Sequence, residues 1–240
     1  MEGKHHSSAD EECINFVPFR VGARAIFVGS SGSGKTHFIA SAIKEREVFF
    51  EVPPPHVVFC THSGSRDLSS AQLTAARRSD GRPLVEFIND VPAEDREFEP
   101  NTLLIFDDLM SDVDGERYMA KILPYYLRRA HHEQLYCFLT VQTLYSRVKF
   151  FSTISENLNY LVMFRSPRSL QQIRHFATQI VGAGNSRDIV EIYREVMRRG
   201  GPYAYLYFAF HPHHDERAQY GTNLFEETGE PCTIYQQVTA

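Results

Sequence analysis

Short apolar runs recur along the chain, separated by segments in which apolar residues fall at helical spacing. Each run is about the length of a buried strand and is bounded by glycine, proline or polar residues. Runs that are apolar on both faces are typical of the interior strands of a parallel sheet. We predict strands at 24–28, 56–60, 84–90, 102–108, 135–141, 159–164 and 202–210.

The segments between these runs have the pattern of amphipathic helices. One face of the second helix collects Tyr118, Ile122, Tyr125 and Tyr126. The predicted helices lie at 37–47, 115–129, 169–180 and 187–198; the prolines at 53–55 stop the first, and paired glycines cap the last. Alternating strands and helices predict an α/β fold, with a mostly parallel central sheet and helices on both faces.

Composition narrows the class of protein. The 240 residues suit one domain at 16–225, after a flexible polar N-terminus at 1–15 and before a C-terminal tail at 226–240. A net charge of -5 argues against a protein that coats nucleic acid by bulk charge. The four cysteines form no close pair, and no apolar run reaches membrane-spanning length. We therefore expect a soluble intracellular protein with reduced cysteines.

A glycine-rich loop is the most specific motif. Residues 29–36 read GSSGSGKT, the complete Walker A pattern, and they lie between a predicted strand and a predicted helix, as this motif requires. Its backbone N–H groups can cradle phosphates at the positive end of a helix dipole. Lys35 would reach the β- and γ-phosphates of ATP, and Thr36 would hold Mg²⁺. The predicted nucleotide-binding residues are Gly29, Ser30, Ser31, Gly32, Ser33, Gly34, Lys35, Thr36 and His37.

Two further strand ends carry polar residues suited to phosphoryl transfer. Asp107 and Asp108 close the run 102–108 in a Walker B pattern, and Gln142 follows the run 135–141. We predict that Asp107 holds Mg²⁺ and that Asp108 orients or deprotonates the attacking water. Gln142 is placed to sense the γ-phosphate, as in P-loop ATPases with an inserted strand between the two motifs.

Other charged residues are less specific. Arg128, Arg129 and Arg147 are candidates for an arginine that stabilises the transition state. The histidines at 131–132 and 211–214 have no cysteine or histidine partner at zinc-ligand spacing, so we interpret them as structural or surface residues.

The order of several motifs resembles a known family over residues 16–225. FVPFRVGARAIFVGSSGSGKT, LVEFINDVP with LLIFDDLM, LRRAHHEQLYCFLTVQTLY, ISENLNYLVMFRSPRSLQQIRHFATQI and GGPYAYLYFAFHP with TNLF follow one another. Together they resemble the FtsK/HerA-superfamily DNA-packaging ATPases of the poxvirus type, most closely those of Polinton/Maverick elements and related double-stranded DNA viruses. The chain departs from that family at Thr143, where asparagine is usual, and at Phe210, where an acidic residue is frequent.

The resemblance implies a RecA-like P-loop motor that hydrolyses ATP with Mg²⁺ and drives double-stranded DNA into a viral capsid. It also implies a homo-oligomeric ring, a capsid portal or vertex protein as partner, no membrane, and work in the host nucleus or cytoplasm where virions assemble. In such rings a neighbour's arginine completes each site, a role that the resemblance carries to Arg129, with Arg128 as alternate. We assign DNA backbone contacts to the basic segment with Arg66, Arg77, Arg78 and Arg82.

A DNA helicase or conjugation-type translocase of the same superfamily remains open beside the packaging motor. Two functions of other classes also remain open from the residues alone. A P-loop kinase of a small molecule could use the basic segment 62–82 as its lid. A nucleotide-gated assembly switch would need only the phosphate loop and little turnover. The paired aspartates and the strand-terminal glutamine favour a hydrolase over both.

Overall fold

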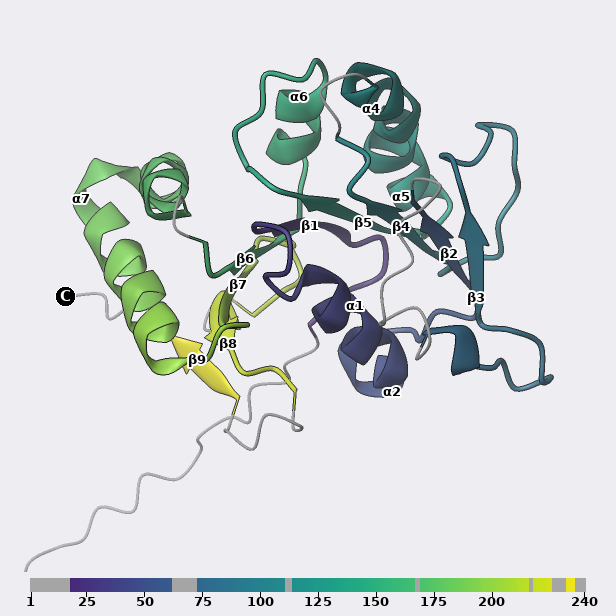
Figure 1. Cartoon of the computed structure of the whole chain (residues 1–240), viewed down its shortest axis with the longest axis horizontal. Helices are drawn as coiled ribbons and strands as arrows, with labels where there is room; N and C mark the ends of the chain where they lie inside the picture. The colour runs from purple at the N-terminus through teal and green to yellow at the C-terminus, as the bar shows by residue number, and fades with distance from the viewer. Residues whose placement is uncertain are drawn as a thin grey trace, which may run out of the picture.

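A nine-stranded sheet runs through the molecule in the order β3-β2-β4-β5-β1-β6-β7-β8-β9 (Figure 1). The computed structural model describes residues 18–61, 73–110, 114–166, 169–215, 218–225 and 232–235, so the predicted flexible N-terminus lies outside the described residues. The strands are β1 Arg24–Val28, β2 Val57–Cys60, β3 Val85–Ile88, β4 Leu103–Asp107, β5 Tyr136–Val141, β6 Tyr160–Phe164, β7 Tyr205–Ala209, β8 Tyr220–Thr222 and β9 Thr233–Tyr235.

The sheet is parallel from β3 to β6 and antiparallel from β6 to β9. The parallel part confirms the predicted mostly parallel α/β fold. Strand β5 lies between β1 and β4, so the strand that precedes the glycine-rich loop does not touch the strand that ends in the aspartates. This is the inserted-strand order that the position of Gln142 predicted.

Helices cover both faces of the sheet, as predicted. The helical segments are α1 Lys35–Lys44, α2 Arg46–Phe49, α4 Gly115–Pro124, the π-helix η1 Tyr125–Arg129, α5 Ala130–His132, α6 Phe151–Glu156 and α7 Ser169–Arg199. Helices α1 and α2 lie on one face, and α4, α5 and α6 lie on the other (Figure 1). Each face has its own buried cluster, because successive strand residues point to opposite sides. Ile26 therefore belongs to the same cluster as Tyr118 and Ile122, whereas Phe27 contacts Phe38 in the other cluster.

Several predicted boundaries were wrong. The first helix ends at Lys44 rather than 47, well before the prolines at 53–55, and a separate short helix follows it. The helix predicted at 115–129 changes to a π-helix at Tyr125, immediately after Pro124, whose ring cannot donate an N–H to the ladder. By contrast, the prediction of two helices at 169–180 and 187–198 is confirmed, because α7 consists of two helical segments separated at Gly182, where φ is 73°.

The C-terminal region contributes more structure than predicted. The run 202–210 is not the last strand, because β8 and β9 extend the sheet beyond it as antiparallel strands. Strand β9 lies within the segment 226–240 that we predicted to be a tail. Both strands are only three residues long, so they do not form a recognisable apolar run. Helix α6 was also missed, because its six residues are too few to show a helical pattern.

The cysteines that fall in predicted strands behave as expected. Cys60 and Cys137 are free thiols in β2 and β5, and burial raises the pKa of each. They are packing residues of the sheet. Among the described residues, no helix has the length and apolar content needed to cross a bilayer.

Candidate functional site

The glycine-rich loop, residues 29–34, connects β1 to α1. Gly32 and Gly34 have φ values of 74° and 103°, a conformation that residues with a Cβ rarely adopt. Ser33 N–H donates to the Ser30 carbonyl, which closes a tight turn inside the loop. The sequence folds this way because glycines allow the left-handed positions that turn the chain directly into a helix N-terminus.

The floor of the loop has no room for a side chain. A Cβ on Gly29 would lie 2.4 Å from Ser33 Oγ and 2.9 Å from Phe164 Cβ. The Ser33 hydroxyl is buried and has no hydrogen-bond partner in the described part of the chain. An unpaired buried hydroxyl and free N–H groups at a helix N-terminus suit an anion with several acceptor oxygens. The residues present therefore fit a polyphosphate.

Lys35 lies over the loop with its amine held by main-chain oxygens. Its Nζ donates to the carbonyl oxygens of Gly29 at 2.7 Å and Ser30 at 3.1 Å, and only 8% of the residue is exposed. Burial lowers the pKa of Lys35, and the charges of Asp108 and Asp107 partly oppose that shift. The carboxylates of Asp107 and Asp108 therefore lie near enough to Lys35 to stabilise its charged form.

The predicted nucleotide-binding residues lie in this loop and at the start of α1. Ser30, Ser31 and His37 are exposed, and Thr36 is half-buried one position after Lys35 in the first turn. The His37 ring stacks against Tyr203, which belongs to a distant part of the sequence. Gly29 N–H donates to the Val141 carbonyl, so the loop is joined directly to the end of β5.

Asp107 lies at the end of β4, in register with Thr140 of β5. The Thr140 hydroxyl donates to Asp107 Oδ1 at 2.7 Å and accepts the Asp108 N–H at 2.9 Å. One buried hydroxyl therefore fixes the carboxylate of the first aspartate and the backbone of the second. Sequence reasoning missed this residue, and its signal was a single hydroxyl in the apolar strand YCFLTV.

Asp108 turns away from the strand and faces Gln142. Its φ is 49°, and the residue is exposed, so its carboxylate is open to water. Gln142 Nε2 lies 3.4 Å and 3.5 Å from the two carboxylate oxygens of Asp108. The structure thus brings Gln142, Asp108 and Asp107 together at the ends of neighbouring strands, beside the loop.

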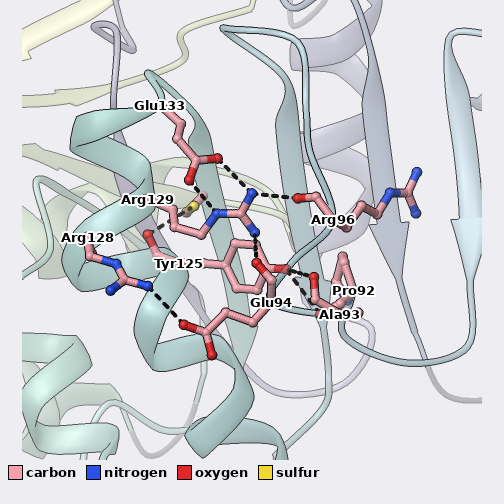
Figure 2. A network of polar contacts seen from close by, with 9 residues as sticks. Pro92, Ala93, Glu94, Arg96, Tyr125, Arg128, Arg129 and Glu133 are labelled. Carbon is pink, nitrogen blue, oxygen red and sulfur yellow. Dashed lines mark hydrogen bonds and ion pairs between the residues drawn. The ribbon is translucent and has the colours of Figure 1, made fainter.

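Arg129 is buried and is held by contacts within its own chain. It is 5% exposed, and its guanidinium donates to Glu133 Oε1 at 2.6 Å and Oε2 at 2.7 Å (Figure 2). It also donates to the carbonyl oxygens of Glu94 at 3.0 Å and Arg96 at 2.6 Å. The Tyr125 ring lies 4.7 Å from its Cζ. These contacts engage the guanidinium within its own chain, and the transition-state role of Arg129 stays a prediction.

The other arginines that the sequence singled out lie outside this buried network. Arg128 is exposed and pairs with Glu94 at 2.9 Å (Figure 2), and Arg147 is exposed in the segment after β5. In the basic segment, Arg82 pairs with Asp80 at 2.6 Å and Arg78 with Glu99 at 3.6 Å. Arg77 donates to a main-chain oxygen at 2.6 Å, and Arg66 lies outside the described residues. The three described members of this segment each have a partner within the chain.

Comparisons with known proteins found similarity among solved structures alone. No protein-family model matches the chain, and no curated protein matches it. The DNA-packaging ATPase B204 of Sulfolobus turreted icosahedral virus has a TM-score of 0.46 and 12% identity, over 91% of this chain and 99% of that one. The genome packaging NTPase B204 of Sulfolobus turreted icosahedral virus 2, in complex with AMP, has a TM-score of 0.46 and 16% identity, over 90% of this chain and 98% of that one. EssC from Geobacillus thermodenitrificans has a TM-score of 0.43 and 9% identity, over 67% of this chain and 34% of that one.

Proposed function

We propose that this chain is a RecA-like P-loop ATPase that works as a homo-oligomeric ring and drives double-stranded DNA into a viral capsid through a portal or vertex protein. One observation carries the hydrolytic part. The loop after β1, the aspartates after β4 and Gln142 after β5 lie at three adjacent strand ends. The motor role rests on the ordered motifs that resemble packaging ATPases over residues 16–225.

The loop and Lys35 bind the triphosphate. Backbone N–H groups of the loop donate to phosphate oxygens, and the Lys35 amine exchanges its main-chain acceptors for the β- and γ-phosphates. The absence of a side chain at Gly29 keeps the floor of the loop open to them. Mg²⁺, when bound with the nucleotide, would be held by Thr36 and Asp107 and would neutralise charge on the phosphates.

Asp108 supplies the base for hydrolysis. Its carboxylate is exposed and lies beside the Gln142 amide, so it can accept a hydrogen bond from a water that attacks the γ-phosphorus. Gln142 donates to the same carboxylate and would orient both the water and the transferred phosphoryl group. Thr140 holds the Asp107 carboxylate and the Asp108 backbone at fixed positions during this step.

Three measurements on the purified full chain test the proposal. ATP turnover should rise with linear double-stranded DNA, and the rise should steepen with protein concentration because ring sites are shared. Asp108→Asn should lower turnover by about a hundredfold or more while ATP still binds. Lys35→Ala should abolish tight triphosphate binding.

Other outcomes would contradict the proposal. Turnover that ignores DNA at every concentration, with or without a portal protein, would exclude the motor. ADP formation that requires a small-molecule acceptor would indicate a kinase, and unchanged turnover in Asp108→Asn would remove its role as base. Normal ATP affinity in Lys35→Ala would overturn the whole site.

A further inference from the structure

An aromatic cavity adjoins the glycine-rich loop on the side away from the aspartates' strand. Its volume is about 370 Å³, and it lies between the start of α1 and the turn that leads into β7. Cavities of roughly 300–1,000 Å³ are the size that small ligands occupy. The lining residues are Gly34, His37, Phe38, Ser41, Phe164, Tyr203, Tyr205 and Phe225.

The floor of this cavity is rigid and apolar. Phe38 contacts Tyr205 and Phe225 with ring centroids 4.9 Å and 4.8 Å apart, and all three side chains are buried. The Tyr205 hydroxyl accepts the Leu224 N–H at 2.7 Å, which fixes the ring from the other side. Such a floor offers a flat ligand an apolar surface that is already formed.

Tyr203 forms the outer wall, and it is unusually exposed for an aromatic residue. It is 63% exposed, and its ring lies parallel to the His37 ring, with 8° between the planes and 6.4 Å between the centroids. A Cβ on Gly34 would lie 3.2 Å from Tyr203 Cδ1. The ring therefore rests against the last glycine before Lys35, directly beside the place where phosphates would bind.

We infer that this cavity receives the purine base of a nucleoside triphosphate whose phosphates occupy the glycine-rich loop, with Tyr203 and His37 as stacking partners. The inference rests on the proposed function, since it needs the loop to bind a triphosphate. Aromatic faces stack on any base, and larger ring systems stack more strongly, so the site would prefer purines to pyrimidines. Tyr203 lies far along the chain from the loop, so no nucleotide motif includes it.

Binding measurements with ATP, UTP and inorganic tripolyphosphate test the inference on the full chain. Tyr203→Ala should weaken ATP binding about tenfold, the size expected for one stacked base, and should bring ATP and UTP affinities together. Tripolyphosphate binding should stay unchanged, because it has no base. Tyr203→Phe should keep wild-type affinity, since it keeps the aromatic face.

A control variant separates stacking from general damage. Phe87 is 38% exposed on β3, at the opposite edge of the sheet, and Phe87→Ala should leave all three affinities unchanged. Wild-type ATP affinity in Tyr203→Ala, or an equal loss for ATP and tripolyphosphate, would overturn the base site and leave the phosphate loop intact. If the wild-type chain binds no triphosphate of any kind, the proposed function itself fails.

Discussion

Thr140 positions Asp107 and Asp108, although it belongs to neither of the sequence motifs that predicted the site. Its hydroxyl is fully buried between β4 and β5, where it contacts both members of the aspartate pair. A hydrogen bond to a carboxylate is stronger than one between neutral groups, and its loss leaves a charged acceptor without its donor. The placement of Asp107 and Asp108 therefore depends on a residue outside the Walker motifs.

Thr140→Val tests this dependence with almost no change of shape. We expect turnover to fall by about tenfold to a hundredfold and the free energy of unfolding to fall by about 1–2 kcal/mol, because Asp107 and the Asp108 N–H lose a shared partner. Steady-state kinetics and urea unfolding measure the two effects. Thr140→Ser keeps the hydroxyl and should restore most of the turnover; a Ser variant as slow as the Val variant would contradict the positioning role.

At the scale of elements, the Arg129 network joins the π-helix η1 to the acidic loop before β4. Its guanidinium contacts Glu133 one turn further on and two main-chain oxygens of the loop 94–96 (Figure 2). Tyr125, from the same π-helix, donates to the Pro92 and Ala93 carbonyl oxygens at 3.1 Å and 2.9 Å. Together these contacts hold a loop of otherwise irregular backbone against the helical face of the sheet.

Arg129→Ala should therefore act on stability. We expect the free energy of unfolding to fall by about 2–4 kcal/mol, because a buried cation is removed from a carboxylate and two carbonyl oxygens that then lack their donor. Arg128→Ala is the matched control, since its exposed pair with Glu94 should contribute less than about 1 kcal/mol. Chemical denaturation compares the two variants. If Arg129→Ala were as stable as Arg128→Ala but had lost turnover, the result would indicate that Arg129 is a catalytic arginine.

At the scale of the whole molecule, the sheet has two parts with different tasks. The parallel strands bring the loop, the aspartates and Gln142 to one edge, because the carboxyl ends of parallel strands lie together. The antiparallel strands β7 to β9 extend the sheet beyond β6, and the turn before β7 places Tyr203 against the loop. One site thus draws residues from nearly the whole chain.

A ring with shared sites predicts how mixed assemblies behave. When Asp108→Asn subunits are added to wild-type chains at constant total concentration, DNA-stimulated turnover should fall more steeply than the wild-type fraction. The reason is that one inactive subunit also impairs its neighbours. Titration of the two proteins in different ratios measures this curve, and a linear fall would show that the subunits act independently.

The sequence by itself determined the parts of this protein that depend on local pattern. Apolar runs predicted seven of the strands that the structure contains. All but the partly exposed edge strand β3 are buried on both faces and are therefore largely apolar. The glycine-rich loop was predictable because positive φ values and contact with phosphate restrict residue choice over eight consecutive positions. The aspartates and Gln142 could be picked out as candidate site residues because each directly follows or ends an apolar run.

Only the tertiary structure decided the features that depend on contacts between distant segments. The sequence pattern of Arg129 is the same whether its guanidinium projects to a neighbour or is buried, and only the position of the loop 94–96 distinguishes them. Strands β8 and β9 are three residues each, too short to show a period. Strand β8 forms because β7 offers an edge to pair with, and β9 then pairs with β8. Tyr203 and Thr140 reach the site through the order of the strands. Sequence spacing does not specify that order, because it is set by packing across the whole sheet.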